Sequence, residues 1–205
     1  MERKQHWERI YTSNKSEKFS WTQDTPDTSI SFLKGFKLPT TAPIIDIGGG
    51  DSKLVDYLLK EGYTDITVLD ISETALDRAK ARLGDNASNV HWIVSDITGF
   101  VPTRNYTLWH DRATFHFLTE ESQLEKYVSV ASGNLTGDGF MTIGTFSENG
   151  PEKCSGLQIR KYSEDMLTSV LQSAFNKLKC IKEDHITPFQ TAQNFLFCSF
   201  QKKEN

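Results

Sequence analysis

Cysteine is scarce in this chain of 205 residues, which has three, at positions 154, 180 and 198. Because their number is odd and their spacing wide, they predict neither a disulfide framework nor a zinc site, and they are typical of a reducing cytoplasm. A chain of this length buries a substantial core without such cross-links. We therefore expect a cytoplasmic protein with one hydrophobic core and no bound metal.

Long apolar runs and an excess of one charge are also missing. No segment approaches the roughly 20 apolar residues that cross a bilayer, and the first seven residues, MERKQHW, lack the apolar core of a signal peptide. Lys and Arg number 23 and are interspersed with 27 Asp and Glu, for a net charge of −4. Since no basic run is long enough to follow a phosphate backbone, we expect binding to neither membranes nor nucleic acid.

The chain contains no internal repeat and no Pro- or Ser-rich linker that would divide it. Residues 1–42 are polar and aromatic, with a helix expected over about Glu2–Tyr11, and from Pro43 onward strand and helix patterns alternate. We predict one domain over residues 1–205, in which 1–42 form a helical, aromatic lid and 43–205 form the core.

The core pattern predicts an α/β fold. Short apolar runs typical of buried parallel strands occupy residues 44–47, 66–70, 90–94, 106–110, 139–146, 177–181 and 195–200. Helices are expected after Ser52 and Ser72, which suit N-caps, and over 120–135 and 163–174. This alternation predicts a Rossmann-like three-layer α/β/α sandwich with a seven-stranded, mostly parallel sheet. The last two strands, with no helix between them, predict an antiparallel hairpin at one edge.

A glycine loop, Asp46-Ile47-Gly48-Gly49-Gly50, follows the first predicted strand. Ligands of parallel α/β sheets bind outside the carboxyl ends of the strands, and glycine lets the backbone approach them closely. The dinucleotide fingerprint requires a further glycine where this chain has Lys53, so that interpretation fails. The acid before the glycines suits a cationic ligand end such as an amino group. A plain strand-to-helix turn is the alternative.

Two further acids end the next two predicted strands. Asp70 lies 20 residues after Gly50, where an acid that binds ribose hydroxyls is expected. A helix-capping role is the alternative for Asp70, although Ser72 is better placed to cap. Asp96 can accept from an exocyclic amine while Ile97 covers the ring, or it can simply begin a loop. Together the acids match the amine, ribose and adenine of S-adenosylmethionine.

These residues resemble the first three motifs of class I S-adenosylmethionine-dependent methyltransferases, and the resemblance covers about residues 5–200. The chain is most similar to the branch that includes thiopurine methyltransferase and related small bacterial enzymes, on its aromatic N-terminus, on Trp21 before Thr22-Gln23, and on Asp111-Arg112 at the end of the fourth strand. The resemblance implies S-adenosylmethionine as cofactor, S-adenosylhomocysteine as product, and no metal. The core cofactor-binding residues are then Asp46, Gly48, Gly49, Gly50, Asp70, Ile71, Asp96 and Ile97.

Aromatic residues of the N-terminal arm are further candidates for cofactor binding. Trp7 and Tyr11 lie four apart, on one face of the expected helix, and Trp21 follows. They can form a packing stripe that attaches the arm to the core. A sulfonium cation, however, is attracted to aromatic faces, and a lid carrying these rings can exclude water from the methyl group.

The fourth strand and the segment after the fifth carry the expected catalytic and substrate residues. His110, Asp111 and Arg112 end the fourth strand, with His110 a candidate base and Arg112 a candidate partner for an anionic substrate or the cofactor carboxylate. Residues 146–162 form a long connection, in which Arg160 and Tyr162 are candidate substrate contacts. A plain excursion without function is the alternative for this connection.

Other functions were weighed against methyl transfer. Aminopropyl transferases often have Asp-Gly after the three glycines, whereas Asp51 is here followed by Ser52, and Arg112 would repel a diamine. A non-catalytic S-adenosylmethionine-binding protein would tend to lack one of the acids or glycines. Because little of the chain is left to build a recognition surface, we expect a small-molecule acceptor, with protein lysine as the alternative.

Overall fold

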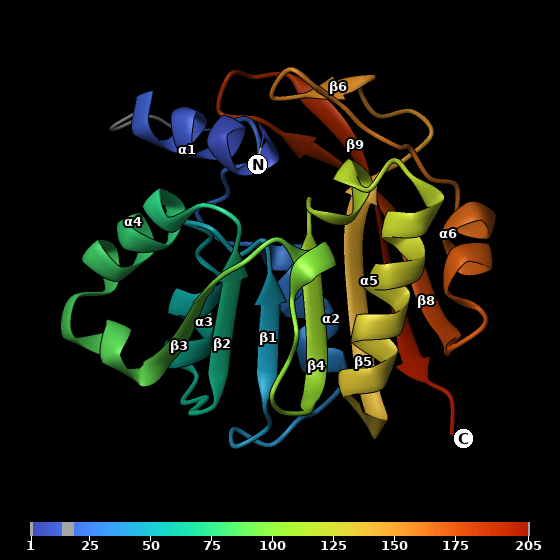
Figure 1. Cartoon of the computed structure of the whole chain (residues 1–205), viewed down its shortest axis with the longest axis horizontal. Coiled ribbons are helices and arrows are strands. Elements are labelled where there is room, and N and C mark those ends of the chain that lie inside the picture. The colour runs from blue at the N-terminus through green and yellow to red at the C-terminus, as the bar shows by residue number, and fades with distance from the viewer. Residues whose placement is uncertain (1, 14–18, 205) are drawn as a thin grey trace.

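The computed structural model describes residues 2–13 and 19–204, which surround one seven-stranded sheet of order β3-β2-β1-β4-β5-β9-β8 (Figure 1). Its strands are β1 (Ile44–Ile47), β2 (Ile66–Asp70), β3 (Val90–Val94), β4 (Tyr106–Arg112), β5 (Leu135–Phe146), β8 (Phe175–Ile186) and β9 (Ala192–Lys202). Strands β1 to β5 are parallel, β9 pairs antiparallel with β5, and β8 pairs antiparallel with β9. This confirms the predicted Rossmann-like fold with its antiparallel hairpin at one edge.

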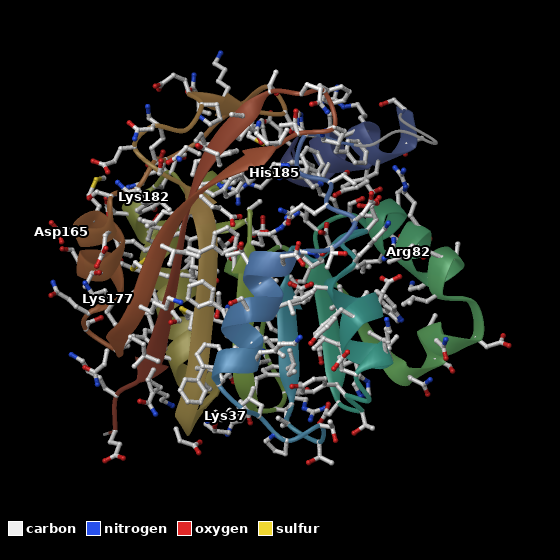
Figure 2. All side chains as sticks on the ribbon, turned by 180° about the vertical axis from the view of Figure 1, so that it is seen from behind. Lys37, Arg82, Asp165, Lys177, Lys182 and His185 are labelled. Carbon is white, nitrogen blue, oxygen red and sulfur yellow. A yellow bond between two sulfur atoms is a disulfide. The ribbon has the colours of Figure 1, made fainter. Side chains whose placement is uncertain are left out.

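Helices cover both faces of the sheet. The helices are α1 (Glu2–Ser13), α2 (Asp27–Gly35), α3 (Leu54–Lys60), α4 (Glu73–Leu83), α5 (Glu121–Asn134) and α6 (Glu164–Leu171). Side chains of α5 and α6 pack with Ile45 and Trp109 on one face, whereas those of α2 and α3 pack with Ile44 and Leu108 on the other (Figures 1 and 2). Neighbouring residues of a strand thus face opposite layers of the sandwich. Because both faces of β1 are covered, all four of its residues are buried.

The N-terminal segment divides between two places. Helix α1 lies across the carboxyl ends of the central strands (Figure 1). Helix α2, which the sequence analysis did not predict, instead packs Ile30 and Leu33 against the sheet. Its apolar residues are few and follow Pro26, so the helical pattern is weak at the level of sequence. Among the described residues, no helix is both long and apolar enough to cross a membrane.

A disulfide between Cys180 and Cys198 corrects the expectation that the cysteines form no cross-link. The two residues are 18 apart in sequence but directly opposite each other in the β8–β9 pair. Both cysteines lie inside predicted strands, Cys180 in 177–181 and Cys198 in 195–200, and the register of β8 with β9 places them opposite each other. The wide spacing of the cysteines in the sequence did not exclude a disulfide, because an antiparallel hairpin brings distant positions together. Cys154 is free and buried.

We expect the denatured protein to react with a thiol reagent at one cysteine without reductant and at three after reduction. Reduction should lower the free energy of unfolding by about 2–4 kcal/mol, because the loop constraint on the unfolded chain is lost. Mass spectrometry of the alkylated protein and urea unfolding with and without reductant measure both effects. In the control variant Cys154→Ser, no thiol should react without reductant. Labelling of all three cysteines in unreduced wild-type protein would contradict the cross-link.

Candidate functional site

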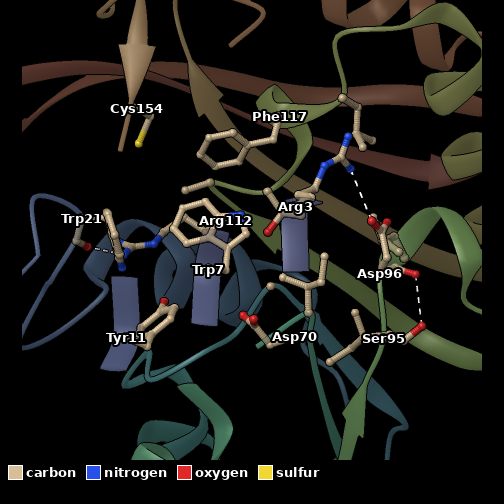
Figure 3. Close-up of a pocket in the computed structure, with 17 residues that line it drawn as sticks. Arg3, Trp7, Tyr11, Trp21, Asp70, Ser95, Asp96, Arg112, Phe117 and Cys154 are labelled. Carbon is tan, nitrogen blue, oxygen red and sulfur yellow. Dashed lines mark hydrogen bonds and ion pairs between the residues drawn. The ribbon is translucent and has the colours of Figure 1, made fainter. Parts of the chain in front are cut away.

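A cavity lies at the carboxyl ends of β1, β2, β3 and β4, beneath α1 (Figure 3). Its base comes from strand ends and the loops that follow them, namely Gly48, Leu69, Asp70, Ile71, Ser95, Asp96 and Ile97. Helix α1 contributes Arg3, Trp7 and Tyr11, and the far end is formed by Trp21, Arg112, Phe117 and Cys154. One end of the cavity is therefore acidic and the other is aromatic with a single cation.

The glycine loop needs its glycines for steric reasons. Gly48 and Gly50 have positive φ values of 64° and 47°, which favour glycine. A Cβ at Gly48 would overlap the hydroxyl of Thr114, and one at Gly50 would lie 2.9 Å from the hydroxyl of Tyr11. Of the three glycines, only Gly48 lines the cavity, while Gly49 and Gly50 lie behind it.

Asp46 and His110 are brought together beneath the glycine loop, outside the cavity. The Nδ1 of His110 lies 2.7 Å from Asp46 Oδ1, and its Nε2 lies 2.9 Å from the Oγ of Ser29 on α2. All three residues are buried. With both ring nitrogens occupied and no exposure to the cavity, His110 is not placed to deprotonate an acceptor. Strand alternation is the reason, since His110 faces α2 and the sequence pattern does not reveal that face.

Asp111 faces the opposite layer and also lies outside the cavity. It accepts hydrogen bonds from the hydroxyl of Tyr127 at 2.8 Å and from the backbone N–H groups of Thr114 and Phe115 at 3.0 and 3.1 Å. Burial raises the pKa of Asp111 to about 6, against the lowering effect of these bonds. These hydrogen bonds hold the turn at Ala113, where φ is 70°. Because Asp111 does not line the cavity, it is not in the position expected of a catalytic residue.

Asp70 and Asp96 both line the cavity, at the ends of neighbouring strands. Asp70 is 6% exposed and accepts hydrogen bonds from the backbone N–H of Ser72, at 2.8 Å, and from that of Gly50. Burial, together with the negative charges of Asp46 and Asp51, raises the pKa of Asp70 to about 7. Asp96 accepts from the N–H and hydroxyl of Thr98 at 2.9 and 2.8 Å and has Arg3 3.5 Å away. Ile71 and Ile97 line the cavity beside them.

The aromatic residues of the N-terminal arm form one connected group over the cavity. The ring of Trp7 has its centroid 5.8 Å from that of Trp21, 6.3 Å from that of Tyr11 and 5.2 Å from that of Phe117. Trp21 also stacks on Phe19 at 4.6 Å. The same rings pack against one another and line the cavity. The two roles considered for them, attachment of the arm to the core and contact with a ligand, are therefore compatible.

Arg112 occupies the far end of the cavity, and no described residue forms an ion pair with it. Its guanidinium donates to the side-chain oxygen of Gln23 and to the backbone carbonyl of Trp21 (Figure 3). Among the described residues, no carboxylate lies within 4 Å of it. Burial lowers the pKa of Arg112, although the charges of Asp46 and Glu183 act in the other direction. A buried cation with only neutral partners is costly unless an anion joins it.

Arg160 and Tyr162, the expected substrate contacts, lie outside the cavity. Arg160 pairs with Glu121 at 2.6 Å, and Tyr162 is fully buried with its ring 5.3 Å from that of Phe115. The connection folds back on itself through β6 (Lys153–Cys154) and β7 (Leu157–Gln158), and a bridge joins Ser147 to Tyr162. This path brings Cys154 to the cavity instead.

Sequence reasoning missed several residues that line the cavity, namely Arg3, Leu69, Ser95, Ala113, Thr114, Phe117, Leu118 and Cys154. For Ser95 and Leu69, proximity to the predicted acids was an available signal. Arg3 precedes Trp7 by four residues, which would have placed it on the same helix face. For Cys154, no local pattern indicates the fold-back that brings it to the cavity.

Comparison with known proteins gives a family match and two curated relatives. Residues 44–139 match the family model described as "Methyltransferase domain". Over 162 residues the chain is 28% identical to a malonyl-[acyl-carrier protein] O-methyltransferase of Ilyobacter polytropus, covering 75% of this chain and 60% of that protein. It is 24% identical to mouse EEF1A lysine methyltransferase 2, covering 68% and 64%. The chain thus spans less than two thirds of either relative.

Solved structures share the fold at low sequence identity. A 1,6-didemethyltoxoflavin-N1-methyltransferase of Burkholderia thailandensis, with bound S-adenosylhomocysteine, has a TM-score of 0.77 at 18% identity, covering 98% of this chain and 87% of that one. The N-methyltransferase NodS of Bradyrhizobium japonicum, also in complex with S-adenosylhomocysteine, has a TM-score of 0.74 at 15% identity, covering 96% and 98%. The architecture is therefore that of these structures along nearly the whole chain.

Asp70→Asn should stabilise the protein, and more so at pH 8 than at pH 5. The pKa of Asp70, about 7 in the folded state, lies above its ordinary value of 3.8. The folded state therefore holds this proton more tightly, and stability is lost as the pH rises from about 4 through about 7, by up to about 4 kcal/mol. Asparagine cannot ionise and escapes this loss.

Urea unfolding at the two pH values measures the difference between wild type and Asp70→Asn. Asp138→Asn, which changes an exposed carboxyl on β5, is the matched control and should leave the pH dependence unaltered. An equal effect of Asp70→Asn at both pH values would show that the carboxyl is not held protonated by burial.

Proposed function

We propose that this chain, whose residues 44–139 match a methyltransferase domain model, transfers a methyl group from S-adenosylmethionine to a small acceptor that bears a negative charge. The observation that carries the proposal is one cavity with carboxylates at the ends of β2 and β3, a glycine loop at β1 and, at β4, a cation with no ion-pair partner among the described residues. The acids supply acceptors at one end, and Arg112 supplies donors at the other.

The residues present fit the cofactor by their chemistry. Asp70 lines the cavity, and its carboxylate, which accepts from the backbone N–H groups of Ser72 and Gly50, keeps further lone pairs for ribose hydroxyls. Asp96 can accept from an adenine amine, with Ile71 and Ile97 as apolar neighbours. Bound S-adenosylmethionine supplies the methyl group on a sulfonium, which is already a good leaving group. Trp7 and Tyr11 cover this region, and their aromatic faces suit a sulfonium cation.

The protein's contribution is then orientation and exclusion of water. Helix α1 closes the cavity with Trp7, while Trp21 and Phe117 narrow its acceptor end. Thr114, held by Asp111 through its backbone N–H, limits movement of the glycine loop. These contacts keep the acceptor and the donor in line without a covalent step on the protein.

The acceptor is expected to arrive without its proton. Among the described residues that line the cavity, none is a histidine, and the carboxylates lie at the cofactor end. At the Arg112 end of the cavity the thiol of Cys154 is titratable, and burial raises its pKa to about 11. Glu183 and His185 interact electrostatically with Arg112 but do not line the cavity. With no base at this end, an acceptor that is already an anion, held by paired hydrogen bonds from Arg112, is favoured over an ammonium group.

Protein lysine is the second candidate acceptor. The similarity to a mouse protein lysine methyltransferase, at 24% identity, is the observation in its favour. Against it stands Arg112, whose charge opposes the entry of an ammonium group. The two candidates differ in the expected effect of changing this one residue.

Titration calorimetry should detect binding of S-adenosylhomocysteine and no binding of NAD. Asp70→Ala should weaken binding of S-adenosylhomocysteine by about 1.5–3 kcal/mol, the range for hydrogen bonds to a charged group. Since a carboxylate accepts from ribose hydroxyls best when ionised, affinity should rise from pH 6 to pH 8 as Asp70, with a pKa of about 7, loses its proton. Asp138→Ala is the control. Binding of NAD in place of S-adenosylhomocysteine would refute the proposal.

Arg112→Lys should lower kcat/KM for an anionic acceptor at least tenfold while changing S-adenosylhomocysteine affinity less than threefold. Lysine keeps the charge but cannot reproduce the planar pair of donors. The acceptor comes from a screen of small thiols, carboxylates and phenols with a labelled methyl donor. Arg104→Lys, at the opposite end of β4, is the matched control. Equal losses of turnover and cofactor affinity would instead assign Arg112 to the cofactor carboxylate, and activity retained on lysine peptides would favour the second candidate.

A further inference from the structure

The side chain of Glu8 attaches helix α1 to the N-terminus of α4. Its Oε1 accepts from the backbone N–H of Glu73 at 2.7 Å, and its Oε2 accepts from the hydroxyl of Ser72 at 3.1 Å and the N–H of Thr74 at 3.3 Å. These donors lie about 65 positions further along the chain. Glu8 therefore caps a helix to which it does not belong.

The same short segment also holds the cofactor-end acid. Asp70 Oδ1 accepts from the N–H of Ser72 at 2.8 Å, and the hydroxyl of Ser72 caps α4 by accepting from the N–H of Ala75 at 3.2 Å. Four successive amides, from Ser72 to Ala75, are thus satisfied by Asp70, Glu8 and Ser72 itself. Free N–H groups at a helix start require such partners, and an anion there is favoured by the helix dipole. Glu8 and Asp70 therefore accept hydrogen bonds from neighbouring residues of the same segment.

The cavity-facing side of α1 is a different stripe of the helix. Arg3, Trp7 and Tyr11 recur every four residues and line the cavity, with Glu8 beside them. A second attachment to α4 comes from Arg78, whose guanidinium donates to the backbone carbonyl of Tyr11 at 3.4 Å and lies 5.8 Å from its ring centroid. Helix α1 thus rests on α4 while presenting its aromatic side to the cavity (Figures 1 and 3).

The charge of Glu8 is suited to this contact. Burial alone would raise the pKa of Glu8, but the hydrogen bonds from Thr74, Glu73 and Ser72 outweigh it and lower the pKa below its ordinary value. The carboxylate is therefore ionised at neutral pH, and both of its oxygens are used. A glutamine at this position offers only one acceptor oxygen and no charge, so it can replace the contact only in part.

We propose that Glu8 is a positioning residue that holds α1 closed over the cavity and, through Ser72, couples that closure to Asp70. Movement of α1 away from α4 removes the acceptor from Ser72, Glu73 and Thr74 and loosens the segment that orients Asp70. A ligand bound at Asp70 orders the same segment and favours the closed position. By linkage the two effects are equal in size. The ligand half of the proposal rests on the proposed function.

The first test measures closure without any ligand. In Glu8→Ala, amide hydrogen exchange of residues 2–13 should accelerate at least tenfold, with a smaller acceleration in Glu8→Gln. The melting temperature and far-ultraviolet circular dichroism show whether each variant is folded, and Glu8→Gln serves if the alanine variant is not. Glu73→Gln, which removes an exposed carboxylate from the same helix terminus, is the matched control and should behave as wild type. Unchanged exchange in both Glu8 variants would overturn the proposal.

The second test measures the coupling to Asp70. Stopped-flow tryptophan fluorescence, reporting through Trp7 and Trp21, should show S-adenosylhomocysteine dissociating at least tenfold faster from Glu8→Ala than from wild type, with Glu8→Gln between them. Faster exchange of α1 with an unchanged dissociation rate would overturn the coupling. If wild type does not bind S-adenosylhomocysteine at all, the proposed function fails, whereas the exchange experiment still decides the role of Glu8 in closure.

Discussion

The constraint on which this structure depends is the burial of carboxylates close together where parallel strands end. Asp46, Asp70 and Asp111 lie at the ends of β1, β2 and β4 and are 3%, 6% and 0% exposed. A desolvated charge destabilises the fold unless it is hydrogen-bonded or neutralised, and neighbouring charges of one sign add to that cost. The surrounding elements are arranged so that each carboxylate receives its own partners.

The three acids differ in their hydrogen-bond partners and in their position. Asp46 and Asp111 support the fold outside the cavity, whereas Asp70 lines it. Asp46 has His110, and Asp111 has Tyr127 and two backbone amides. Asp70 has the backbone amides of Ser72 and Gly50 and the greatest rise in pKa of the described carboxyls, to about 7. Of the three acids, Asp70 is the one that lines the cavity, which makes it the one available to a ligand.

Local sequence patterns were sufficient for the strands, the glycine loop and the positions of Asp70 and Asp96. Each of these depends on a short apolar run and on what directly follows it, which fixes the carboxyl end of a parallel strand. The family resemblance added the aromatic arm and Arg112, which the structure also brings to the cavity. The order of the helices and strands followed from the same alternation.

Residues whose role depends on a face or on a distant element were beyond sequence reasoning. His110 and Asp111 alternate between the two layers, and which layer each enters depends on α2 and α5. The Cys180–Cys198 cross-link depends on the register of β8 with β9, and the displacement of Arg160 and Tyr162 depends on how the 146–162 connection folds back. No pattern of neighbouring residues contains this information.

On the proposed function, the free thiol of Cys154 lies in the same cavity as a methyl donor. A methyl donor is an alkylating agent, so a nucleophilic side chain there would compete with the intended acceptor. Thiolates, not thiols, react with electrophiles, and the pKa of Cys154, about 11, keeps almost all of it protonated at neutral pH. The protonated thiol of Cys154 can therefore pack as a polarisable group in the lining of the cavity without being methylated itself.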